Sequence, residues 1–270
     1  MLHKIVETKK QEVAQLKAAT RAEDFLNQIK TMPDTLGFRN ALINSARPVS
    51  VIAEVKKASP SKGIIREQFD PVEIAKAYAA AQADAMSVLT DQQYFQGNLE
   101  YLRQIRQAVQ IPLIRKDFLI DELQVLEARA AGADCILLIA AILDGNELHH
   151  LNQVAESVGL DVLIEVHDTE ELETVLNSTT PKLLGVNNRN LKTFQTDIAT
   201  TQQLITQVPA DIPLVSESGI SSASDITYLH SIGARSVLVG EHFMRQDDIA
   251  QAVIDLVGEK PAANQTQEVR

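Results

Sequence analysis

The sequence has a single cysteine and no hydrophobic run long enough to cross a membrane. Cys135 lies in an apolar stretch and has no second cysteine with which to form an intrachain disulfide, so nothing requires an oxidising compartment. The apolar stretches fall short of the roughly 18 residues of a membrane span, and the charged residues behind Met1 leave no apolar core for a signal peptide. We therefore expect a cytoplasmic protein without membrane association.

Basic residues are scarce relative to acidic ones. Lys and Arg number 25 against 36 Asp and Glu, which gives a formal net charge of -11 at pH 7. This excess of negative charge argues against nucleic acid or an anionic membrane as a partner, so a bound anion must be held by a local positive site. The same charge disfavours casual self-association, and we expect a monomer rather than a dimer.

Two kinds of ligand-binding motif are missing as well. None of the six histidines has the spacing of a metal site, so no metal ion is expected. The Gly-x-Gly-x-x-Gly pattern of dinucleotide-binding folds does not follow the first apolar run, which argues against a nicotinamide or flavin cofactor. We expect the protein to need no cofactor.

Short apolar runs alternate with longer helical patterns from residue 51 onward. Their starts are separated by roughly 20 to 35 residues, the length of a strand, a helix and two loops. We identify eight such runs, at residues 51–55, 85–89, 112–114, 135–139, 162–166, 183–186, 213–215 and 236–239. Eight parallel strand and helix units in about 200 residues predict an α/β fold, a closed (β/α)8 TIM barrel rather than an open sheet.

The first 48 residues do not follow this alternation. Apolar residues at helical spacing, among them Ile5 and Val13 and then Phe25 and Ile29, predict two amphipathic helices, and Phe38 begins a third short one. We expect residues 1–48 to form a helical extension that lies on the barrel. Residues 1–260 are predicted to form one domain, and the polar tail 261–270 is expected to be disordered.

Charged residues follow several of the predicted strands. In a (β/α)8 barrel the active site forms at the carboxyl ends of the strands, and side-chain alternation decides which residues face the mouth. Ile52, Glu54 and Lys56 share one face of the first strand, and the same parity selects Lys116 and Glu165 on the third and fifth. One such residue is more often part of a rim salt bridge, but together they predict a charged cluster with perturbed pKa values.

The last two strands end in glycine-containing turns. Ser218 and Gly219 follow the seventh strand, and Gly240 and Glu241 follow the eighth. These are the strands after which (β/α)8 barrels commonly bind phosphate through backbone N–H groups. The glycines would also suit ordinary turns that need a positive φ, but their shared position favours a phosphate site.

Six segments carry these candidate site residues: IAEVKKASPSKG at 52–63, IRKDF at 114–118, IEVH at 164–167, GVNNRNL at 185–191, SESG at 216–219 and VGE at 239–241. Taken together, these segments resemble the indole-3-glycerol phosphate synthase family of tryptophan biosynthesis. The resemblance implies a carboxy-lyase that converts 1-(2-carboxyphenylamino)-1-deoxyribulose 5-phosphate into indole-3-glycerol phosphate, carbon dioxide and water. It leaves room for contact with other enzymes of aromatic amino acid biosynthesis.

The resemblance also implies roles for individual residues. Lys116 matches the general acid, Glu165 is the candidate for acid–base work in the dehydration, and Lys56 transfers a proton or holds the substrate carboxylate. The catalytic residues implied are Glu54, Lys56, Lys116, Glu165, Asn187 and Ser218. The substrate-binding residues implied are Ser59, Gly219, Gly240 and Glu241 for the phosphate, Phe95, Phe118 and Leu137 for the aromatic ring, and Arg189 and Glu217.

One departure and three alternatives remain open. Some family members carry lysine where this chain has Ala58, so Lys57 and Lys62 are left out of the catalytic set, and Lys62 is expected on a loop that closes over substrate. The alternatives are an isomerase of phosphoribosylated anthranilate, an aldolase that uses Lys116 as a Schiff-base nucleophile, and a barrel that binds a phosphorylated ligand without turnover.

Overall fold

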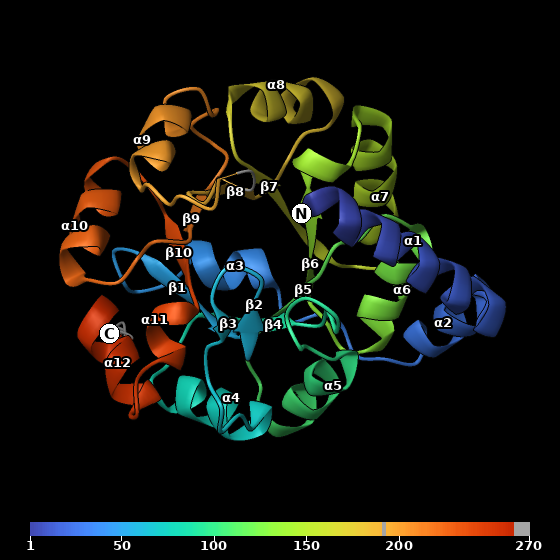
Figure 1. Ribbon diagram of the computed structural model, residues 1–270, viewed down its shortest axis with the longest axis horizontal. Helices are drawn as coiled ribbons and strands as arrows, with labels where there is room; N and C mark the ends of the chain where they lie inside the picture. The colour runs from blue at the N-terminus through green and yellow to red at the C-terminus, as the bar shows by residue number, and fades with distance from the viewer. Residues whose placement is uncertain (191–192, 262–270) are drawn as a thin grey trace, which may run out of the picture.

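Parallel strands close into a barrel surrounded by helices (Figure 1) in the computed structural model, which describes residues 1–190 and 193–261. The order of strands around the barrel is β1-β10-β9-β8-β7-β6-β5-β4. The bounds are β1 (Ser50–Val55), β4 (Ala85–Leu89), β5 (Leu113–Lys116), β6 (Cys135–Ile139), β7 (Asp161–Val166), β8 (Leu184–Asn187), β9 (Leu214–Glu217) and β10 (Ser236–Val239). The predicted (β/α)8 barrel is confirmed.

Three strands differ from their predicted bounds at both ends, and β8 is shifted by one residue. Strands β5 and β9 begin one residue after the prolines with which the predicted runs start, and each continues two residues beyond the predicted end. At those ends Lys116 pairs in register with Leu89, and Glu217 pairs with Asn187. The polar residues therefore belong to the sheet itself, which gives their side chains rigid backbone support.

The helices that ring the barrel begin and end where local chemistry predicts. Asp70 caps α4, since its carboxylate accepts hydrogen bonds from the N–H groups of Val72 and Glu73, and Gly132 and Gly233 follow the ends of α6 and α10 with positive φ. The helices are α4 (Pro71–Ala80), α5 (Leu99–Ala108), α6 (Glu122–Ala130), α7 (Gly145–Ser157), α8 (Thr169–Ser178), α9 (Ala199–Ile205), α10 (Ala223–Ser231), α11 (Glu241–Met244) and α12 (Ile249–Val257), with a 3₁₀ turn at Ala140–Ile142. None of the described helices is long and apolar enough to cross a membrane.

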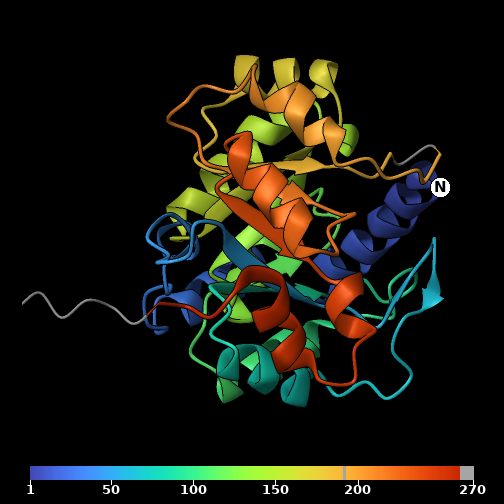
Figure 2. The same cartoon turned by 90° about the vertical axis from the view of Figure 1, so that its left-hand side faces the viewer.

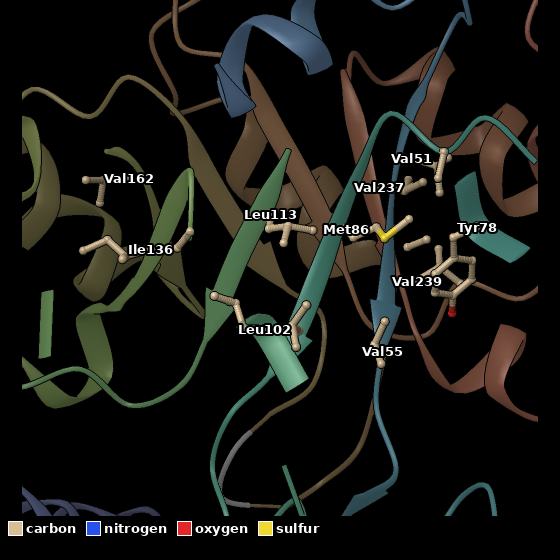
Figure 3. Packing of buried hydrophobic residues seen from close by; sticks show 14 of the residues in the cluster. Val51, Val55, Tyr78, Met86, Leu102, Leu113, Ile136, Val162, Val237 and Val239 are labelled. Atoms are coloured by element: carbon tan, nitrogen blue, oxygen red, sulfur yellow. The ribbon is translucent and has the colours of Figure 1, made fainter. Parts of the chain in front are cut away.

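The strands divide their side chains between two apolar clusters. Val51 and Val55 of β1 belong to the outer cluster between the sheet and the helices (Figure 3), whereas Ile52 belongs to the cluster inside the barrel. On β5 the same alternation separates Leu113, outside, from Ile114, inside. The residues that the sequence predicts to face the barrel interior therefore do so. Glu54, two residues after Ile52 on the same face of β1, points into the barrel.

The N-terminal segment forms three helices, α1 (Leu2–Ala19), α2 (Ala22–Ile29) and α3 (Phe38–Ile43). Phe38 and Leu42 are fully buried in the cluster inside the barrel, and the N–H of Arg39 donates to Asp161, the first residue of β7. Helix α3 therefore closes the end of the barrel at which the strands begin, and in the projection of Figure 1 it is seen inside the ring of surrounding helices. The tail expected to be disordered lies outside the described residues from residue 262 onward.

A small hairpin follows β1, where the sequence predicts only a loop. Strands β2 (Ala58–Ser59) and β3 (Gly63–Ile64) pair antiparallel, with Ser59 opposite Gly63. Gly63 has a φ of 66°, a value that glycine adopts without steric cost. Figure 2 shows the hairpin standing out from the barrel on the side of the N-terminus, and Lys62 therefore lies in its turn.

Candidate active site

A cavity of about 720 Å³ opens at the carboxyl ends of the barrel strands. It is lined by the ends of the strands, by the β2–β3 hairpin and by the first turn of α1, where Met1, Leu2 and Ile5 face it. Every site residue inferred from the sequence lines this cavity: Glu54, Lys56, Ser59, Phe95, Lys116, Phe118, Leu137, Glu165, Asn187, Arg189, Glu217, Ser218, Gly219, Gly240 and Glu241. The structure brings the set together, and the role of each residue stays a prediction.

Lys116 lies between two buried carboxylates inside the cavity. Its Nζ is 3.1 Å from Glu165 Oε2 and 2.8 Å from Glu217 Oε2. Burial disfavours the charged ammonium, but the charges of Glu165 and Glu217 outweigh this effect and raise the pKa of Lys116 above its ordinary value. Lys116 is therefore protonated in the resting site, as a general acid must be.

The two carboxylates differ although they share one lysine. Burial favours the neutral form of Glu165, but Lys116 and His167 outweigh it and hold the pKa of Glu165 below its ordinary range. Burial raises the pKa of Glu217 to about 7, because Lys116 offsets burial only in part and the charge of Glu165 adds to the rise. One carboxylate is thus ionised throughout the neutral range, while the other takes up a proton more readily.

Glu54 and Lys56 form a second ion pair at the end of β1. Glu54 Oε2 lies 2.5 Å from Lys56 Nζ, and the hydroxyl of Ser87 donates to Glu54 Oε1 over 3.4 Å. A side chain on Gly240 would overlap the Glu54 carboxylate, and the φ of Gly240 is −126°. Close approach, and not a positive φ, therefore requires glycine at the end of β10.

Ser218 and Gly219 follow β9 in the left-handed region, with φ of 70° and 78°. The side chain of Asn188 holds this turn, since its Nδ2 donates to the backbone oxygen of Ser218 over 3.0 Å. Such a conformation is strained for serine, and it persists because buried contacts fix it. The predicted turn is therefore held in place by a buried side chain and forms part of the cavity wall.

Cations gather where the sequence predicts a phosphate. Arg245 Nη2 lies 3.0 Å from Glu241 Oε1, with Lys62 Nζ at 3.6 Å and Arg189 Nη2 at 3.8 Å from the carboxylate of Glu241. Arg189 also donates to the hydroxyl of Ser61 over 3.3 Å. Among the described residues its ion-pair partner is Glu241, and not Glu54 or Glu217 of the same cavity. These side chains supply the local positive charge that an anion requires on a chain of net charge -11.

Two aromatic rings form an apolar wall. The ring centroids of Phe95 and Phe118 lie 6.1 Å apart at an interplanar angle of 42°, and Leu137 rises from the cluster inside the barrel. This tilted arrangement is within the range that aromatic pairs favour. The wall gives the cavity an apolar lining beside its charged residues.

Lys9 connects α1 to the loops that carry both rings, a contact that sequence reasoning missed. Its Nζ lies 2.7 Å from Asp91 Oδ2 and 2.9 Å from Asp117 Oδ1, and its side chain is 1% exposed. Asp91 in turn accepts a hydrogen bond from the N–H of Phe95 over 3.1 Å. Ser87, which has the inward parity of β4, is a second missed contact, and only that parity could have identified it.

Within the described ranges, no three His, Cys, Asp or Glu side chains are grouped so as to hold a metal ion. The cavity instead presents an ammonium between two carboxylates, a second Lys–Glu pair and a cluster of cations. A barrel strand-end cavity with these groups defines an enzyme that performs acid–base chemistry on a small anionic substrate.

Comparison with known proteins gives the family. A family model described as Indole-3-glycerol phosphate synthase matches residues 2–256. Proteins with that name from Priestia megaterium and Rhodospirillum rubrum are 48% and 49% identical to this chain; the alignments cover 98% and 96% of it and 100% and 99% of the relatives. The chain belongs to the indole-3-glycerol phosphate synthase family.

Solved structures with low sequence identity share the fold. Thiamine phosphate pyrophosphorylase from Pyrococcus furiosus superposes with a TM-score of 0.58 at 15% identity, over 78% of this chain and 95% of its own. A mutant tryptophan synthase α-subunit from P. furiosus gives 0.58 at 13% identity, over 79% and 99%. At these identities the likeness concerns the barrel alone.

Proposed function

We propose that the chain converts 1-(2-carboxyphenylamino)-1-deoxyribulose 5-phosphate into indole-3-glycerol phosphate, carbon dioxide and water, as a carboxy-lyase of tryptophan biosynthesis. The observation that carries the proposal is the Lys116 ammonium held between Glu165 and Glu217 inside the cavity. Ring closure needs a proton donor at a carbonyl oxygen, and a buried protonated lysine supplies one. Membership of the family supports the same reaction.

Lys116 acts first in the proposed mechanism. Its ammonium protonates the substrate carbonyl while the aromatic carbon that bears the carboxylate attacks the carbonyl carbon. Loss of carbon dioxide then restores the aromatic ring. Because two carboxylates raise the pKa of Lys116, substrate that displaces one of them makes Lys116 a stronger acid.

Dehydration follows at the same site. The hydroxyl formed in the first step takes up a proton and leaves as water, and a proton leaves the neighbouring carbon to complete the indole double bond. We assign acid–base work in this step to Glu165. Lys56, oriented by Glu54 at 2.5 Å, transfers the second proton or holds the substrate carboxylate, and Asn187 hydrogen-bonds the substrate near the reacting carbon.

The remaining residues bind the substrate in this proposal. Phe95, Phe118 and Leu137 contact the aromatic ring, and the phosphate lies at Ser59 and the backbone of Gly219, Gly240 and Glu241. Ser218 positions the substrate between these two regions. Arg189 contributes charge to the phosphate site, and Glu217, whose pKa is raised by burial, offers a hydrogen bond to the bound substrate.

A fluorescence assay tests the reaction directly. Purified chain is mixed with 1-(2-carboxyphenylamino)-1-deoxyribulose 5-phosphate, and the appearance of indole fluorescence is followed. Product formation is expected, and folded protein without product would contradict the proposal. Borohydride treatment in the presence of substrate separates acid catalysis from a Schiff base, since covalent labelling of Lys116 would contradict its role as an acid.

We also propose that the chain works as a monomer in the cytoplasm, with residues 1–260 as one domain. The net charge of -11 supports the monomer, because like charge disfavours self-association. Light scattering should give a mass near 29.7 kDa, and a doubled mass would contradict it. One cooperative unfolding transition is the result expected for a single domain.

A further inference from the structure

The ring of His167 lies between two carboxylates just beyond the end of β7. Its Nε2 is 3.3 Å from Glu165 Oε1, and its Nδ1 is 2.9 Å from Glu171 Oε2. Glu171, in the first turn of α8, also accepts a hydrogen bond from the backbone N–H of His167 over 2.8 Å. The side chain of His167 is 8% exposed; its Nδ1 is hydrogen-bonded to Glu171, while its Nε2 lies within ion-pair distance of Glu165 without forming a hydrogen bond.

Glu165 therefore has a different partner at each oxygen. Lys116 faces Oε2 at 3.1 Å, and His167 faces Oε1. Among the described residues Glu217 has Lys116 alone within ion-pair distance, and its Oε1 is buried without a hydrogen-bond partner. The two carboxylates that share Lys116 are thus unequal, and His167 makes the difference.

The surroundings of His167 favour its charged form. Burial acts against the charge, but the charges of Glu165 and Glu171, together with the hydrogen bond to Glu171, outweigh burial and raise the pKa of His167 to about 10. Within the described ranges the charged groups that contact the ring are Glu165 from β7 and Glu171 from α8, and Lys116 of β5 reaches it only through Glu165.

The second cation matters when Lys116 gives up its proton. At that moment the buried carboxylate of Glu165 loses its nearest counter-charge, and an unpaired buried carboxylate tends to take up a proton. A cation at Oε1 that takes no part in the transfer keeps Glu165 ionised until the dehydration step. This argument rests on the function proposed above.

We propose that His167 is a positioning residue that fixes the orientation of Glu165 and keeps it ionised between the two proton transfers, with Glu171 as the anchor of the imidazole ring. His167 contacts Glu165 and lies outside the set of residues that line the cavity, so it acts through Glu165. Glu171 holds it from the outer side of the barrel end.

Two substitutions at position 167 separate the two ring contacts. The amide nitrogen of asparagine falls near Nδ1, so His167→Asn keeps the Glu171 contact and loses the Glu165 contact. The amide nitrogen of glutamine falls near Nε2, so His167→Gln keeps a neutral donor toward Glu165. The pH dependence of kcat and KM is measured for both variants beside the wild type, with thermal midpoints as the measure of folding.

His167→Asn is expected to move the acidic limb of the kcat profile upward by about one pH unit, because loss of a nearby cation raises the pKa of Glu165. Below that limb kcat falls about tenfold, since one unit changes the ionised fraction tenfold. KM changes less than about twofold, because the aromatic wall and the phosphate site are untouched. His167→Gln should show a smaller shift.

Two results would overturn the proposal. One is identical pH profiles for His167→Asn and His167→Gln, and the other is a lower kcat without any shift of the acidic limb. A purely structural role of His167 predicts one of these two results. Glu171→Gln provides the same test if the position 167 variants do not fold, and it should move the limb in the same direction. Absence of product with the wild type would contradict the proposed function instead, so the two failures are distinct.

Discussion

At the scale of single residues, one ammonium group serves two buried carboxylates. Lys116 contacts Glu165 and Glu217 over 3.1 and 2.8 Å, but within the part of the chain that the structure describes only Glu165 has a second cation, His167. The pKa of Glu165 is lowered and that of Glu217 is raised to about 7. Residues of the same type in the same cluster therefore hold different protonation states, because burial acts on both and counter-charge acts mainly on one.

Lys116→Met should reduce kcat by about a thousandfold, because general acid catalysis contributes on the order of 10² to 10⁴ in rate. The fold should persist, since the two carboxylates left without the lysine can share a proton. The assay is indole fluorescence, with circular dichroism as the measure of folding. Lys57→Met is the matched control, because Lys57 points away from the mouth by parity; near-normal turnover of Lys116→Met would contradict the role of Lys116.

Glu217→Gln should change how stability depends on pH. The folded-state pKa of Glu217 is raised from 4.5 to about 7, so folding takes up a proton and the free energy of unfolding falls as pH rises through that window. The shift corresponds to about 3 kcal/mol, and glutamine removes it. Urea unfolding at pH 5 and pH 8 should show the variant gaining stability relative to the wild type as pH rises; a constant difference would contradict the raised pKa.

At the scale of elements, α1 is fastened to the barrel by a buried charge. Lys9 of α1 contacts Asp91, in the loop after β4, and Asp117, directly after β5. Those loops carry Phe95 and Phe118. The helix, although distant in sequence, thereby fixes the two rings of the apolar wall.

Lys9→Met should destabilise the fold by about 3 to 5 kcal/mol, because it leaves buried aspartates without their counter-charge. It should also raise KM through displacement of Phe95 and Phe118. Lys10→Met is the control on the same helix: its side chain is 61% exposed and its pair with Glu7 is of the kind worth under about 1 kcal/mol. Chemical unfolding followed by circular dichroism measures both, and equal effects would contradict the anchoring role of Lys9.

At the scale of the whole molecule, the barrel is closed at one end and open at the other. Helix α3 places Phe38 and Leu42 inside the strands at their amino ends, while the charged cavity lies at the carboxyl ends. The charged residues at the carboxyl ends therefore lie above an apolar interior, and α3 closes that interior at the amino ends. Stability and chemistry are separated along the axis of the barrel.

Phe38→Ala should cost about 3 to 5 kcal/mol of unfolding free energy, because it opens a cavity in the packed interior. We expect one cooperative transition at lower denaturant and an unchanged kcat at low temperature, since the substitution lies at the opposite end from the site. Leu36→Ala, at a side chain 43% exposed, is the control and should cost under about 1 kcal/mol. Loss of kcat without loss of stability would contradict this separation.

Much of the fold was predictable because its signal is local. Each strand is visible in the sequence as a short apolar run. For the two runs that start with proline, the predicted bounds differ from the observed strand by only one or two residues. The β2–β3 hairpin was missed because its strands have two residues each, and Gly63 and Ile64 are exposed and show no apolar alternation. Lys9 was missed because a lysine on an amphipathic helix resembles a surface residue when its partners are far away in sequence.

The sequence by itself determined the barrel and the parity that sends Glu54, Lys56, Lys116 and Glu165 toward its mouth, because hydrophobic alternation depends only on neighbouring residues. Only the tertiary structure decided the partners: Lys56 with Glu54, and Lys116 with both Glu165 and Glu217. Charge and burial act through space, so pKa values depend on distances between strands that are remote along the chain. The same reason makes His167 a neighbour of the cluster and not merely the residue before a helix.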